Sequence, residues 1–103
     1  MAWGEKDRQF LQSGAAQAAA LLRAVGNEHR LLVLCLLLEH GEMSAGALHE
    51  YIPLSQSAFS QHLARMRDDG LIAFRREAQT LHYFIANPDV ARLIATLKAI
   101  YCP

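Results

Sequence analysis

The segment SAGALHEYIPLSQSAFSQHLARMRDDGLI, residues 44–72, decides the fold of this chain. Ser44 and Ser55 are of a type that caps helices, because the hydroxyl accepts a hydrogen bond from a free N–H of the first turn. Pro53 rules out continuation of the first helix. Gly70 follows the second helix, at the position where glycine commonly ends a helix. The segment therefore predicts a short helix, a turn and a longer helix over 56–69, which together form a helix-turn-helix.

The residues before this segment predict two more helices. Apolar side chains recur at helical spacing from Phe10 to Val25, and the alanine-rich stretch within this range has high helix propensity. Asn27 is a good N-cap for the next helix, which is apolar all round and stops at Gly41. A helix of that kind is expected to lie buried at the centre of a small domain.

The residues after the segment predict a hairpin and a last helix. Two β-type runs, 71–76 and 81–86, surround four turn-forming residues. Asn87 and Pro88 then open a helix with one apolar stripe. The expected fold class is mainly α with a small β-hairpin wing, in the order α-α-α-α-β-β-α. This is a winged helix-turn-helix.

Length and composition predict a single domain over residues 1–103, with residues 1–9 as a disordered tail. The first residues show no signal-peptide pattern. The longest apolar run, 31–38, is far shorter than the ~20 residues that cross a bilayer. We therefore expect a cytoplasmic protein without a membrane partner. The net charge is zero, but residues 56–76 carry four basic and two acidic side chains, a local excess that indicates anion binding there.

The predicted helix over 56–69 has two contrasting faces. Phe59, Leu63 and Met66 share one narrow arc and are expected to face the core. The opposite face is small, polar and uncharged, whereas helix surfaces that only meet water typically carry Lys and Glu. Serine and glutamine can hydrogen-bond the edges of bases, and arginines at the flanks can reach phosphates. The expected DNA-binding residues are Gln56, Ser57, Ser60, Gln61, Arg65 and Arg67 on the helix, with Arg75, Arg76 and Gln79 on the wing.

Three stretches resemble the ArsR/SmtB family of small dimeric winged-helix repressors: HRLLVLCLLL at 29–38, the opening segment at 44–72, and AQTLHYFI at 78–85. The pattern Ser-Gln-Ser-x-x-Ser-Gln-His-Leu at 55–63 is the most specific of them. The resemblance implies that Gln56, Ser57, Ser60 and Gln61 face the bases of an inverted-repeat operator. It also implies a homodimer paired through the first and last helices. His62 lies toward the core side of the 56–69 helix and is expected to be a packing residue.

The residues do not match the family's metal sites. The thiolate pattern of the third helix is replaced by Glu-Met-Ser-Ala-Gly at 42–46, and residues 90–103 contain no histidine to accompany Asp89. We therefore expect no metal. No catalytic triad order, carboxylate cluster or phosphate-binding glycine loop is present, so we expect no enzyme activity.

Two cysteines remain, Cys35 in the central helix and Cys102 after the last one. They resemble the thiol pair of the sulfide-responsive branch of this family. That resemblance implies that reactive sulfur species link the two thiols, by a disulfide or a polysulfide, and release the operator. Leucines flank Cys35, so desolvation is expected to raise its thiol pKa.

Two alternatives stay open. Cys102-Pro103 is a Cys-Pro dipeptide, a pattern seen at some haem thiolate sites, so a haem-responsive regulator is the second interpretation. Otherwise we expect no cofactor. A metal-sensing repressor that uses the cysteines and a remote histidine is the third.

Overall fold

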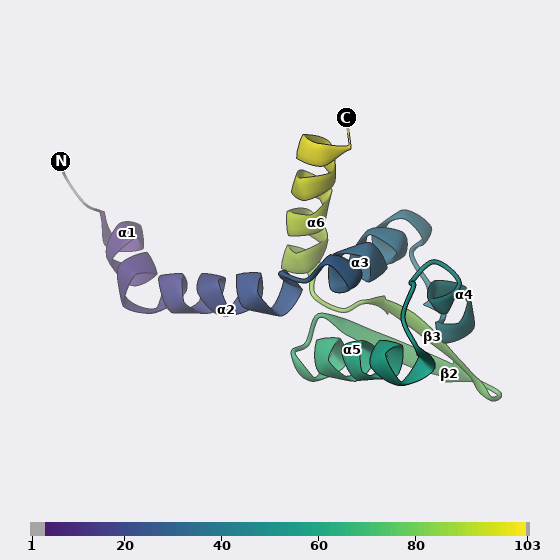
Figure 1. Cartoon of the computed structure of the whole chain (residues 1–103). Helices are drawn as coiled ribbons and strands as arrows, with labels where there is room; N and C mark the ends of the chain where they lie inside the picture. The colour runs from purple at the N-terminus through teal and green to yellow at the C-terminus, as the bar shows by residue number, and fades with distance from the viewer. Residues whose placement is uncertain (1–3, 103) are drawn as a thin grey trace.

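The computed structural model describes residues 4–102. Helices α3 to α6 and the strands form a body, and α1, η1 and α2 extend from it as an arm (Figure 1). The described chain measures 55 × 30 × 22 Å along its principal axes. The elements in chain order are α1 Glu5–Gln9, the π-helical turn η1 Phe10–Gly14, α2 Ala15–Val25, α3 Glu28–His40, β1 Met43–Ser44, α4 Ala45–His49, α5 Gln56–Asp68, β2 Ile72–Glu77, β3 Thr80–Ile85 and α6 Pro88–Tyr101. The expected fold class, mainly α with a small hairpin wing, is confirmed.

A single core forms around α3. Leu34 and Leu37 of this helix are no more than 1% exposed, as are Phe59 and Met66 of α5 and Ile94 of α6. The face of α5 expected to be buried is therefore the buried one. One side of α3 differs from the expectation of a helix buried all round, because Leu32 is 41% exposed. That open side lies beyond the reach of the other elements of this small body.

The predicted caps begin the helices. The Asn27 side chain accepts hydrogen bonds from the backbone N–H groups of His29 and Arg30, at 3.0 and 3.2 Å. The hydroxyl of Ser55 accepts one from Ala58 at 3.1 Å and so starts α5. Gly70, with φ +75°, then turns the chain from α5 into β2, a conformation that side chains with a Cβ rarely adopt.

The wing contains one strand that the sequence did not reveal. β2 and β3 pair antiparallel, from Ile72 opposite Ile85 to Glu77 opposite Thr80. The first strand therefore begins and ends one residue later than predicted. The two-residue strand β1 then pairs with the other edge of β3, which gives the order β1-β3-β2. Such a short strand has no periodicity to detect, since only its pairing partner defines it.

The arm differs from the expected tail over residues 1–9. Residues 5–9 form α1, whose first turn is stabilised by the Asp7 carboxylate, which accepts the N–H of Gly4 at 3.1 Å. Acidic side chains at a helix N-terminus also interact favourably with the helix dipole. Residues 1–3 lie outside the described residues. Between residues 4 and 102 no helix is long and apolar enough to cross a membrane.

Candidate DNA-binding surface and cysteine site

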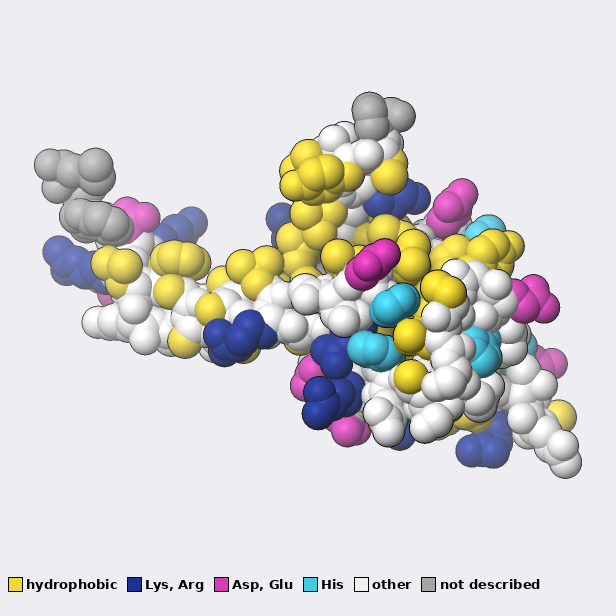
Figure 2. All heavy atoms as spheres, viewed as in Figure 1, with side chains coloured by type: hydrophobic (Ala, Val, Ile, Leu, Met, Phe, Trp, Pro, Cys, Tyr) yellow, Lys and Arg dark blue, Asp and Glu magenta, His cyan; other side chains and the backbone are white. Residues whose placement is uncertain are grey.

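The outer face of α5 presents a polar, uncharged surface. Gln56, Ser57, Ser60 and Gln61 are all exposed, while the opposite side of the same helix is buried in the core. The Gln56 amide donates a hydrogen bond to the Ser60 hydroxyl at 3.2 Å, so these two side chains already lie together. In Figure 2 the surface over α5 is mostly white, with dark blue and magenta side chains at the end that leads into β2. The structure thus brings the four predicted base contacts onto one open face.

Hollows border this face on both sides. One, of about 550 Å³, is lined by residues that include Gln61, Arg65 and Arg30 of α3. The other, of about 340 Å³, lies between α5 and β3 and includes Ser60 and Arg67. The Arg67 guanidinium also sits 5.1 Å from the ring centroid of Phe74, a cation–π contact that ties the helix to the wing. The polar face therefore has an arginine on each flank, as predicted.

The two wing arginines have different environments. Arg75 contacts both oxygens of Glu42, with the shortest N–O distance 2.7 Å, and it contacts Glu77 at 2.9 Å. Hydrogen bonds from Arg75 lower the pKa of both carboxyl groups, and they raise the pKa of the guanidinium itself. The Arg75 charge is thus offset by two carboxylates, a pairing that the sequence did not reveal because Glu42 lies 33 positions away.

Strand register places Arg76 on the other face of the wing. Arg75 lies opposite His82, and Arg76 lies opposite Leu81. Because side chains alternate along a strand, Arg76 shares its face with Phe74, and this face is the one that packs toward α5. Arg76 is exposed, and Gln79 is exposed in the turn between the strands. Strand register therefore places Arg76 on the α5 side of the wing, and Gln79 lies at its tip.

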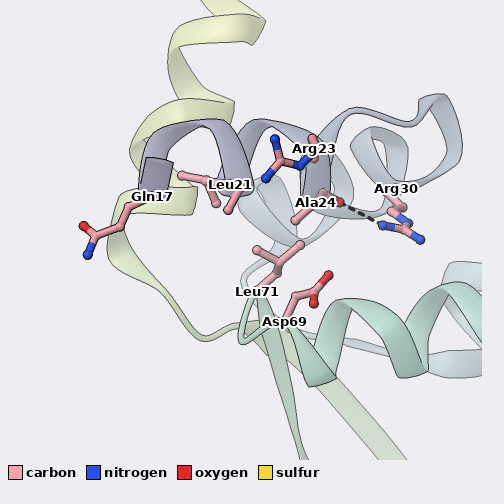
Figure 3. A pocket seen from close by; sticks show the side chains of 8 residues that line it. Gln17, Leu21, Arg23, Ala24, Arg30, Asp69 and Leu71 are labelled. Carbon is pink, nitrogen blue, oxygen red and sulfur yellow. Dashed lines mark hydrogen bonds between the residues drawn. The ribbon is translucent and has the colours of Figure 1, made fainter. Parts of the chain in front are cut away.

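No pattern in the sequence indicated a role for Arg30, a residue of α3 that connects three helices. Its Nε donates to Nδ1 of His62 on α5 at 3.1 Å, and its Nη1 donates to the carbonyl of Ala24 on α2 at 3.0 Å. Figure 3 shows the second bond at the edge of an open hollow of about 500 Å³ between α2 and the end of α5, which Arg23 and Asp69 also line. His62, expected to be a packing residue, is half-buried and accepts a hydrogen bond.

Both cysteines line one cavity. Cys35 is half-buried on α3, and Cys102 is exposed at the C-terminal cap of α6. The cavity between them has a volume of about 200 Å³. Burial raises the pKa of the Cys35 thiol, as its leucine neighbours predicted, whereas the nearby Lys98 ammonium opposes that rise. The remaining lining residues are Leu31, Ile94, Leu97 and Tyr101.

The metal and haem alternatives involve the same cysteines and stay predictions. Among residues 4–102 no group of three or more His, Cys, Asp or Glu side chains is placed to hold a metal ion. The haem alternative rests on the Cys102-Pro103 dipeptide. Cys102 is exposed at the end of α6, and Pro103 lies outside the described residues.

Together, the exposed helix face, its arginine flanks and the wing define a winged helix-turn-helix DNA-binding protein. A sequence profile for the bacterial regulatory proteins of the arsR family matches residues 27–73. The regulator YgaV of Escherichia coli K12 is 55% identical over 93 residues, which are 90% of this chain and 94% of YgaV.

Two solved structures are similar over nearly the whole chain. Reduced HlyU from Vibrio cholerae has a TM-score of 0.85 at 45% identity and covers 92% of this chain and 99% of its own. The transcriptional repressor BigR from Xylella fastidiosa has a TM-score of 0.83 at 31% identity and covers 93% and 97%. The chain belongs to the ArsR family, as the motif at 55–63 predicted, and it is a DNA-binding transcriptional regulator rather than an enzyme.

The Arg30–His62 contact predicts a pH-dependent stability. Burial, with Arg30, His29 and Arg65 nearby, lowers the pKa of His62 below its ordinary value of 6.5. The unfolded chain therefore binds a proton at higher pH than the folded one, so stability falls as the pH drops below about 6.5 and is unaffected above it. His62→Asn keeps an acceptor and does not titrate, so we expect a smaller loss between pH 7.5 and 5.5 in urea unfolding. His40→Asn, on the surface, is the control. Equal losses in wild type and His62→Asn would contradict this account.

Proposed function

We propose that this protein is a homodimeric repressor that releases its operator when reactive sulfur species connect Cys35 to Cys102. The observation that carries the proposal is the shared cavity, to which α3 and α6 each contribute one thiol. Residues 67 positions apart in sequence thus face the same small apolar space. A relative with a similar structure, HlyU, has been solved in a form called reduced, which also supports a redox-active regulator.

The bridge forms in two displacement steps. The Cys35 thiolate attacks the sulfane sulfur of a donor R–S–S–H. The donor S–S bond breaks, and RS⁻ leaves with the electron pair and is protonated by water. The Cys102 thiolate then attacks Sγ of the Cys35 persulfide and expels HS⁻, which leaves a disulfide. In total, two thiols lose two electrons and one sulfane sulfur is reduced to sulfide. If a second donor first lengthens the Cys35 persulfide by one sulfur, attack on the inner inserted atom leaves a trisulfide.

The environment of Cys35 favours sulfane sulfur over peroxide. Peroxide reacts fastest with exposed thiols of low pKa, and Cys35 is half-buried with a raised pKa. A thiolate of higher pKa is intrinsically more nucleophilic, so the raised pKa slows attack on sulfane sulfur less than it slows the reaction with peroxide. A direct disulfide also requires Cα atoms within about 7 Å, a limit that inserted sulfur atoms relax.

The dimer is proposed from apolar side chains that the monomer leaves in water. They lie on the arm and on α6, and Figure 2 shows yellow surface along both elements. Exposed apolar patches of this kind mark association sites, and pairing of identical chains through the same surfaces closes with two-fold symmetry. The large exposed residues are Phe10, Leu11, Leu22, Ile100 and Tyr101.

Light scattering on the purified protein tests the dimer. We expect twice the chain mass of 11.5 kDa at micromolar concentration, because the exposed apolar surface is removed from water on pairing. Replacing Leu22 by glutamate introduces a charge into that surface and should shift the mass toward the monomer. Glutamate in place of Gln12, an exposed residue of the same arm, is the control. A wild-type mass of one chain would contradict the proposal.

DNA binding is assigned to the α5 face and the Arg76 side of the wing. In a two-fold dimer the two α5 helices enter successive major grooves about 34 Å apart, which matches an inverted repeat. A bridge between α3 and α6 would link the central helix to a dimerisation helix and change this spacing. Operator release then follows from geometry, without unfolding of either subunit.

Two substitutions separate base reading from phosphate contact. Gln61→Ala should cost about 1–3 kcal/mol on the cognate operator and little on random DNA, because a lost base contact affects only the specific complex. Arg76→Ala should weaken both complexes similarly and reduce the salt dependence of binding. Fluorescence anisotropy at several salt concentrations measures both. Operator binding of Gln61→Ala that equals wild type would show that α5 docks in another way.

Intact mass spectrometry and operator binding after treatment with a persulfide donor test the switch. We expect added sulfur that joins the two cysteines, together with weaker operator binding, and much slower change with peroxide. Cys35→Ser and Cys102→Ser should stay bound to DNA, because neither can complete the bridge. Release of DNA by either mutant, or an equally fast peroxide response, would rule out this mechanism. A Soret band on haem titration would instead favour the haem-responsive alternative.

A further inference from the structure

The cavity that holds the thiols has one cationic residue in an otherwise apolar lining. Among the described residues that line it, Lys98 is the one basic side chain, and the others are aliphatic, aromatic or thiol side chains. About one third of the Lys98 side chain is exposed, so its stem is largely covered while the ammonium reaches the rim. This charge has no role in the bridge chemistry described above, which uses only the two sulfur atoms and a donor.

Two pairs of residues lie across the contact between α3 and α6: Glu39 with Lys98, and Cys35 with Cys102. Glu39 lies one helical turn after Cys35 on α3, and Lys98 lies one turn before Cys102 on α6. The Lys98 Nζ and Glu39 Oε2 atoms are 3.8 Å apart. Glu39 is 63% exposed, and an ion pair that is long and open to water binds weakly. The ammonium of Lys98 is therefore available to a second anion in the cavity.

We infer that Lys98 makes the cysteine cavity selective for small anionic sulfane-sulfur donors, of which hydropolysulfide ions are the simplest. This inference rests on the proposed sulfur switch and adds the charge and size of the donor. The volume of about 200 Å³ is enough for a short chain of sulfur atoms. The apolar walls suit polarisable sulfur, and the one cation compensates the charge that the donor brings.

The reaction itself accumulates negative charge beside Lys98. The Cys35 thiolate attacks the terminal S–H sulfur of HS–S–S⁻, forms a new S–S bond and breaks the donor's bond. The products are the Cys35 persulfide and S₂²⁻, which then takes a proton from water. Two negative charges must approach each other, and both reside on the leaving group at the end of the step. A nearby cation lowers the cost of that approach, since like charges repel strongly outside bulk water. Peroxide is neutral, so the cation accelerates its reaction with the thiolate much less.

Alkylation with a matched pair of reagents tests the charge selectivity without any sulfur donor. Iodoacetate and iodoacetamide are similar in size, but only iodoacetate is an anion. Both react with the same Cys35 thiolate, so a change in the thiolate fraction cancels in the ratio of their rates. Peptide mass spectrometry on the reduced full-length protein gives that ratio at Cys35. In Lys98→Met, which keeps the unbranched stem, we expect the iodoacetate-to-iodoacetamide ratio to fall about threefold or more.

Two further variants make the test specific. Glu39→Gln removes the carboxylate that competes for Lys98, so the ratio should rise. Lys6→Met, the same substitution on α1, should leave it unchanged. Circular dichroism confirms that each variant is folded. An unaltered ratio in Lys98→Met, or an equal change in Lys6→Met, would overturn the inference.

A second arm distinguishes this inference from the switch. Operator release is timed with sodium tetrasulfide, which supplies anionic hydropolysulfides, and with neutral dimethyl trisulfide. Lys98→Met should release more slowly than wild type with the first and at a closer rate with the second. If neither reagent releases wild-type protein from DNA, the switch is wrong, whatever the alkylation ratios are. If tetrasulfide releases wild type and Lys98→Met equally fast, the switch holds and the role of Lys98 is rejected.

Discussion

The packing of α3 at the centre of the single core is the constraint on which the rest of the structure depends. Leu34 and Leu37 are buried there, and α3 packs against α6, β1 and β3. A chain of 103 residues has too little apolar area for a second core, so every element of the body must bury its apolar face against this one. The orientation of the α5 surface relative to α6 is consequently fixed through α3.

The same helix carries the groups that connect the cysteine site to the DNA-binding surface. Cys35 lies half-buried on α3 and lines a cavity with residues of α6. Arg30, near the start of α3, donates hydrogen bonds to His62 of α5 and to the last turns of α2. A packed core does not deform gradually, because a small displacement of one helix must be accommodated by its neighbours. In the proposed switch, a bridge from α3 to α6 would therefore act on α5 and on the arm through these contacts.

Charge is used sparingly and locally in this protein. The net charge is zero, and the exposed face of α5 before Arg65 is polar but uncharged. Arg75 is paired with Glu42 and Glu77, so it holds the wing against the start of β1, whereas Arg76 is exposed on the α5 side. In the proposed DNA complex, a surface of this composition would gain less from non-specific attraction and more from contacts with base edges. The cysteine cavity likewise has one ammonium group, that of Lys98, among apolar side chains.

The sequence alone determined the helices from residue 10 onward, their caps, the buried face of α5 and the family, since all of these depend on local spacing and short motifs. Asn27 and Ser55 cap helices through neighbours two or three residues away, and Phe59, Leu63 and Met66 reveal their face by periodicity. Only the tertiary structure decided β1, the pairing of Arg75 with Glu42, the Arg30–His62 contact and the cavity shared by the two cysteines. Each of these joins groups far apart in the chain. No local pattern specifies such a contact, because its partner is chosen by how the whole core packs.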